Sequence, residues 1–182
     1  MHPKTKKLVK VASAAITMAA VVTPATGALA QDSGPGGLTR AQRQVVREAT
    51  ERFRDVDTAI AAGYLPSDAC AALPGVGGMG YHFVNPALSS DAKVDPTTPE
   101  ILVYRKLANG RFRLSALEWF VADADQDVTT DVDRPTLMGH PFDGPMAGHE
   151  PGMPVHYDLH AWVYQSNPAG ELSAWNPDAH CN

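Results

Sequence analysis

The sequence predicts a single α+β domain, in which an N-terminal amphipathic helix packs on an antiparallel, curved or barrel-like sheet with one disulfide. Three observations predict this fold class. A helical stripe of apolar residues starts near Thr39, a β-hairpin pattern spans residues 101–122, and two cysteines occur in a chain that begins like an exported protein.

The helix signal begins with a capping box. Thr39 is a favourable N-cap, and Gln42 follows three residues later. Apolar residues then recur alternately three and four positions apart: Val46, Ala49, Phe53, Val56 and Ile60. This spacing predicts one helix with one buried face, and Gly63 is placed to end it.

Residues 101–122 carry the clearest hairpin pattern. Two β-rich runs flank Asn109-Gly110, a pair that suits a type I′ turn. Alternate residues from Phe112 to Phe120 are expected to share one face, on which Glu118 is the only charge. Residues 81–86 and 155–165 also resemble strands, and residues 64–80 are expected to form a loop.

Residues 1–30 have the pattern of a signal peptide. Four lysines precede an apolar stretch, and Ala-Leu-Ala at 28–30 is typical of a cleavage site. We therefore expect a secreted protein, with residues 31–38 as a flexible lead-in and 39–182 as one domain. No later stretch is apolar and long enough to predict a membrane span.

The charge of the chain argues against two classes of partner. Loss of residues 1–30 removes four of the 15 Lys and Arg residues and none of the 20 acidic ones, so the net charge falls from −5 to −9. Few basic residues are left to neutralise phosphates, which disfavours nucleic acid and anionic membranes. The expected partner is a small molecule or a protein.

The two cysteines, Cys70 and Cys181, are expected to form a disulfide, because exported chains meet oxidising conditions. Such a bond would tie the C-terminus to the segment that follows the helix. A thiol nucleophile is correspondingly disfavoured.

The sequence His-Tyr-Asp-Leu-His at 156–160 points to a metal or catalytic site. On a strand, His156, Asp158 and His160 would share a face, but the outer two α-carbons would lie about 13 Å apart. The two histidines are therefore not equally good candidates to bind one ion. Candidate ligands on other strands are His82 and Glu118, and Asp158 is expected to support a ligand histidine.

Three other patterns in the sequence bear on which ligand the protein binds. Each of the four methionines beyond residue 30 is closely followed by a histidine, which raises copper beside zinc as the divalent metal. Gly75, Gly77 and Gly80 match a dinucleotide-binding pattern, but no strand–turn–helix context surrounds them. The aspartates from Asp123 onward lack the glycine and glutamate that define an EF-hand loop.

From about Phe53 to its end, the chain resembles a family of exported bacterial proteins that have no assigned activity. The residues that carry the resemblance are Met-Gly-x-His at 79–82 and a closing pattern, His-x-x-Leu-His-x-Trp, Asn-Pro-x-Gly, Trp-Asn-Pro and Cys, over residues 156–181. The resemblance directs attention to His82, Glu118, His156 and His160. It implies no mechanism.

The functional hypothesis is a secreted protein that binds a divalent transition metal through His82, Glu118, His156 and His160. If it is an enzyme, a metal-bound water would be the economical nucleophile or base. The alternative is a non-catalytic module that binds a small ligand or a protein, with structural histidines.

Overall fold

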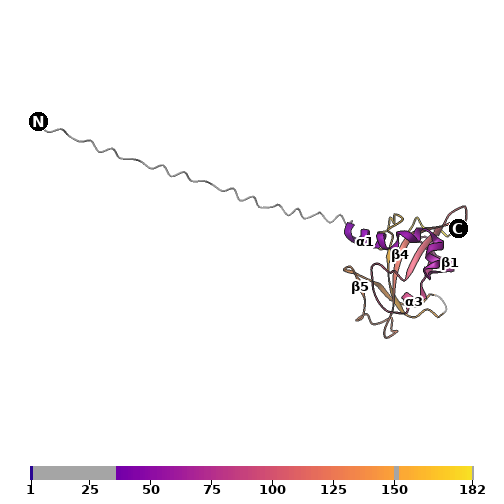
Figure 1. The fold of residues 1–182 in the computed structure, drawn as a ribbon. Helices are drawn as coiled ribbons and strands as arrows, with labels where there is room; N and C mark the ends of the chain where they lie inside the picture. The colour runs from indigo at the N-terminus through magenta and orange to yellow at the C-terminus, as the bar shows by residue number, and fades with distance from the viewer. Residues whose placement is uncertain (2–35, 150–151, 182) are drawn as a thin grey trace. The chain divides into compact units, whose positions relative to one another are not determined.

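The computed structural model describes residues 1, 36–149 and 152–181, and it combines helices with antiparallel strands, as expected for an α+β fold (Figure 1). The predicted signal peptide lies, apart from Met1, outside the described residues. The elements in chain order are α1 (Arg40–Thr50), the 3₁₀ helix η1 (Glu51–Arg54), α2 (Val56–Ala61), β1 (Leu65–Leu73), β2 (Gly77–Val84), α3 (Pro86–Ser89), β3 (Ile101–Lys106), β4 (Phe112–Ala122), β5 (Thr136–Leu137), β6 (His140–Pro141), β7 (Asp143–Met146) and β8 (His156–Ala161).

The helical segment begins at the predicted capping box and ends at Gly63. The Thr39 hydroxyl accepts the Gln42 N–H, and the Gln42 side chain accepts the Thr39 N–H. The prediction of one continuous helix is wrong, because Asp55 leaves the helical conformation and caps α2. After this break Ile60 faces outward, and the residue is 44% exposed. Gly63, with φ +96°, follows the last turn.

Six strands form one sheet in the order β1-β2-β3-β4-β8-β7, and β5 pairs only with β6. All pairs in the large sheet are antiparallel. The expectation of a barrel-like sheet is wrong, since among the described residues β1 and β7 are unpaired edges. Residues of both edge strands line one cavity, together with the C-terminal segment. The expected loop at 64–80 is also wrong, because β1 occupies most of it.

The sheet has two faces that differ in chemistry. One face packs with Val46 and Phe53 of the helical segment in the main hydrophobic core. The strand residues in that core are mainly Phe83, Leu102, Tyr104, Leu114, Leu117, Trp119, Tyr157, Leu159 and Ala161. The alternate residues point to the second face, where Val103, Ala116, Trp162 and Ala179 form a smaller cluster.

The predicted hairpin is formed by β3 and β4, but its turn and its faces differ from expectation. The N–H of Leu107 donates to the Arg111 carbonyl, and only Gly110 of the loop has a positive φ, so the turn is not type I′. A register shift lies between Val103 and Tyr104, opposite residues 114–116. This irregularity places Leu114 in the main core and Ala116 on the second face.

The C-terminal segment covers part of the second face and is fastened to β1 and β2. Cys70 and Cys181 form the predicted disulfide. Gly78 and Asn176 exchange two backbone hydrogen bonds of 3.0 Å. A Cβ atom on Gly78 would meet the Ala179 carbonyl oxygen at 2.7 Å. A Cβ atom on Gly77, a member of the dinucleotide-like pattern, would likewise meet the backbone of Asn176, so the glycines here leave space for the returning chain rather than for a nucleotide.

Candidate metal centre

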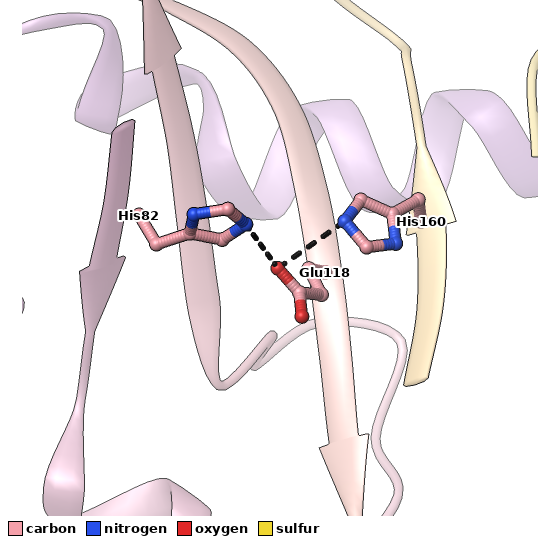
Figure 2. A group of neighbouring side chains, drawn as sticks. All are labelled: His82, Glu118 and His160. Carbon is pink, nitrogen blue, oxygen red and sulfur yellow. Dashed lines mark ion pairs between the residues drawn. The ribbon is translucent and has the colours of Figure 1, made fainter. Parts of the chain in front are cut away.

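Three of the predicted site residues meet on the second face of the sheet. His82 comes from β2, Glu118 from β4 and His160 from β8, and both imidazoles point at the Glu118 carboxyl group (Figure 2). Their side chains are 16%, 4% and 0% exposed, respectively. The group is therefore almost completely removed from water.

Strand register explains why these residues converge. Glu118 and His160 are direct cross-strand partners in the β4–β8 pair. His82 of β2 lies opposite Val103 of β3, and Val103 lies opposite Ala116 of β4. Ala116 is two residues from Glu118, so both side chains lie on the same face of the sheet. The His82 ring therefore reaches across β3 on this face to meet the Glu118 carboxyl group.

The distances within the group are short. Oε2 of Glu118 lies 3.1 Å from Nε2 of His82 and 3.4 Å from Nε2 of His160. One potential ligand atom from each of the three residues lies within 4.8 Å of the others. In a tetrahedral site with metal–ligand bonds of about 2.1 Å, ligand atoms would be about 3.4 Å apart. Small movements of the two rings would therefore suffice to surround one ion.

The ionisable side chains of this group shift one another's pKa values. Burial alone would raise the pKa of Glu118, but the imidazoles of His160 and His82 outweigh it and hold that pKa well below its usual range. Burial alone would lower the pKa of His160, but the carboxyls of Glu118 and Asp158 raise it to about 10. Without a metal, the buried glutamate is thus neutralised by a protonated His160.

Asp158 lies behind His160 on the same strand face. Its Oδ1 is 3.7 Å from Nδ1 of His160, and the residue is 1% exposed. Several buried atoms of this group have no hydrogen-bond partner within the described structure: Oε2 of Glu118, both carboxyl oxygens of Asp158, and both ring nitrogens of His160. Buried polar atoms are normally satisfied, so their concentration here points to a missing partner.

The structure places His156 apart from this group. His156 is paired with Ala122 of β4 and Met146 of β7, four residues along β8 from His160. Its ring stacks on Phe120 at a centroid distance of 5.0 Å, and its Nδ1 lies 3.1 Å from the Pro154 carbonyl oxygen. Its environment is that of a packed histidine, with only Nε2 left unpartnered.

A cavity of about 840 Å³ opens beside the group. Met79, Met146 and His149 line it together with Asp158, so part of the methionine–histidine pattern gathers here. Asp143 also lines it, and no sequence motif predicted this residue as a site residue. No local pattern marks Asp143, because its position depends on the pairing of β7 with β8.

Comparison of the chain with protein-family models, with curated proteins and with solved structures found no match. Within residues 36–149 and 152–181, no helix has the length and apolar character needed to cross a membrane. The functional argument therefore depends on the geometry of the site.

Proposed function

We propose that this chain is an exported protein that binds one divalent transition metal ion through His82, Glu118 and His160. The observation that carries the proposal is the convergence of these three side chains on a buried face, in a group of atoms that lack hydrogen-bond partners. Asp158 accepts from Nδ1 of His160 in this proposal and so orients the ring toward the ion, as carboxylates commonly do behind ligand histidines.

The donor set favours zinc, with copper as the second choice. Two imidazoles and one carboxylate are common ligands of zinc, and imidazole also suits Cu(II). Thioethers would favour Cu(I), but Met79 and Met146 line the neighbouring cavity and are not members of the His82–Glu118–His160 group.

Three protein ligands leave room for a fourth. Structural zinc sites usually have four protein ligands, whereas catalytic sites keep one position for water or substrate. The proposed centre matches the second arrangement, and an enzyme that activates water is the activity it suits best. Support for export comes from the leader pattern of residues 1–30, from the disulfide, and from the resemblance to exported bacterial proteins.

The test is a calorimetric titration of protein prepared without a histidine tag or a metal column and stripped with EDTA. Zn²⁺ and Cu²⁺ are titrated separately into the wild type, His82→Ala and His140→Ala. We expect one saturable site that is lost in His82→Ala and kept in His140→Ala, because His140 lies on β6 outside the group.

The competing function is a non-catalytic binding module, and one observation favours it. The ion pairs between Glu118 and the two histidines already compensate the buried charge without a metal. Under this alternative neither metal would bind in the titration, and His82→Ala would change only the stability of the fold.

A further inference from the structure

The cavity beside the proposed metal centre has an unusual distribution of charge. It is about 840 Å³ and is enclosed by residues of β1, β2, β7 and β8 and by the C-terminal segment 172–175. Two carboxyl groups line it, from Asp143 and Asp158, and neither Lys nor Arg contributes to its described wall. Most of the remaining wall is apolar.

The two carboxyl groups face each other. Asp143 and Asp158 are direct partners in the β7–β8 pair, so their Cβ atoms are expected about 5 Å apart on one face. Partial burial and the neighbouring carboxyl of Asp158 both raise the pKa of Asp143. Both residues line the cavity, and Asp143 is exposed whereas Asp158 is buried.

Asp158 has acceptor capacity that no described residue uses. Neither of its carboxyl oxygens has a hydrogen-bond partner, although the residue is 1% exposed. Its Oδ1 faces His160, which leaves Oδ2 for a ligand in the cavity. A buried acceptor without a partner is costly, so a donor is expected to approach it.

The apolar side chains of the cavity wall indicate what kind of molecule carries that donor. Met79, Met146, Leu172 and Trp175 line the same cavity. A calcium ion would need six to eight oxygen ligands, which two carboxyls between thioethers do not supply. An organic ammonium ion suits both the carboxyl groups and the apolar wall. Its N–H groups donate to carboxylates, and its positive charge is attracted to the face of an indole ring.

We propose that this cavity binds a small organic ammonium ion, whose N–H groups donate to Asp143 and Asp158 and whose apolar part packs against Trp175 and the methionines. This ligand would lie next to the metal centre, because Asp158 contacts both. The proposal goes beyond metal binding and does not require it, because Asp143 belongs to the cavity and not to the metal group.

The test uses EDTA-treated protein and three probes of similar size: benzylammonium, the neutral benzyl alcohol and the anionic benzoate. Binding is measured by calorimetry at constant ionic strength. We expect one saturable site for benzylammonium, at least about tenfold tighter than for benzyl alcohol, because hydrogen bonds between charged groups are stronger than those of a neutral hydroxyl, and no binding of benzoate, because it repels the carboxyl groups.

Asp143→Asn is the informative variant, and Asp57→Asn, on the exposed side of α2, makes the same charge change elsewhere. Benzylammonium affinity should fall about tenfold in Asp143→Asn, with Asp57→Asn unchanged and zinc affinity retained in both. The proposal is overturned if benzylammonium binds no tighter than benzyl alcohol, or equally well to Asp143→Asn. Zinc binding without benzylammonium binding would overturn this proposal alone, and the reverse result would overturn only the metal proposal.

Discussion

Nε2 of His82 lies 3.1 Å from Oε2 of Glu118, although β3 separates the strands that carry these two residues. On β3, Val103 lies opposite His82 and Ile101 lies opposite Glu118, so the contact crosses β3 on the second face of the sheet. His160 approaches the same oxygen from the other side. One carboxylate oxygen thus joins three strands, and the following predictions depend on this arrangement.

Glu118→Gln should weaken both the fold and metal binding. The amide keeps the shape of the side chain but leaves the buried His160 without its main counter-charge. Breaking a buried ion pair costs about 3–5 kcal/mol, so we expect a loss of about 3 kcal/mol in the free energy of unfolding at pH 6. Urea unfolding of the metal-free protein measures this, with Glu48→Gln on the exposed side of α1 as control. Equal stability of the two variants would contradict the account.

Metal binding should release a proton between pH 7 and 9. The pKa of His160 is raised to about 10, so this imidazole holds a proton that a metal ion must displace. Apparent affinity should therefore rise with pH, by about tenfold per unit. Calorimetry in buffers of different ionisation enthalpy counts the released protons. If the affinity for the metal does not change with pH and no proton is released, His160 is not the ligand that loses a proton.

Glu100 should make the fold less stable as pH rises from about 4.5 to 7. Burial raises its pKa to about 7, although it accepts a hydrogen bond from the Phe120 N–H. In this range the unfolded chain has lost the proton that the folded protein keeps, so the free energy of unfolding falls with increasing pH.

Glu100→Gln keeps an acceptor for Phe120 and removes the charge. Between pH 5 and 8 the free energy of unfolding should fall by about 2–3 kcal/mol more in the wild type than in Glu100→Gln. Chemical unfolding at both pH values provides the measurement. The same pH dependence in the two proteins would rule out Glu100 as its source.

Loss of the disulfide should destabilise the domain strongly. Cys70 and Cys181 are 111 residues apart, so the bond restricts a long loop of the unfolded chain. The chain-entropy model assigns about 4–5 kcal/mol to such a bond. Cys70→Ala/Cys181→Ala should unfold at the same urea concentration as the reduced wild type and well below the oxidised protein. A double variant as stable as the oxidised protein would refute this.

The sequence allowed prediction of those features that local patterns encode. Thr39 and Gln42 predict where the helix begins. The strand pattern around Glu118 predicts a strand that carries one charged residue among apolar ones. Features that depend on pairing between distant strands were missed. The open sheet, β1 within the expected loop and the approach of Asp143 to Asp158 follow from long-range register, which no local window contains.

The histidines of β8 show the same limit within the candidate site. Alternation correctly placed His156, Asp158 and His160 on one face and argued against two equal histidine ligands. It could not say which histidine would meet Glu118. Only the register of β4 against β8 decides that, by pairing Glu118 with His160 and Ala122 with His156.

The most direct test of the metal proposal is therefore the metal content of His160→Ala against His156→Ala, for untagged protein reconstituted with zinc and dialysed. Both histidines are fully buried on the same strand, so His156→Ala is the control for removing a buried imidazole from β8. We predict close to one zinc ion per chain for the wild type and for His156→Ala, and almost none for His160→Ala. A wild type without zinc, or a His160→Ala variant that retains it, would contradict the proposed centre.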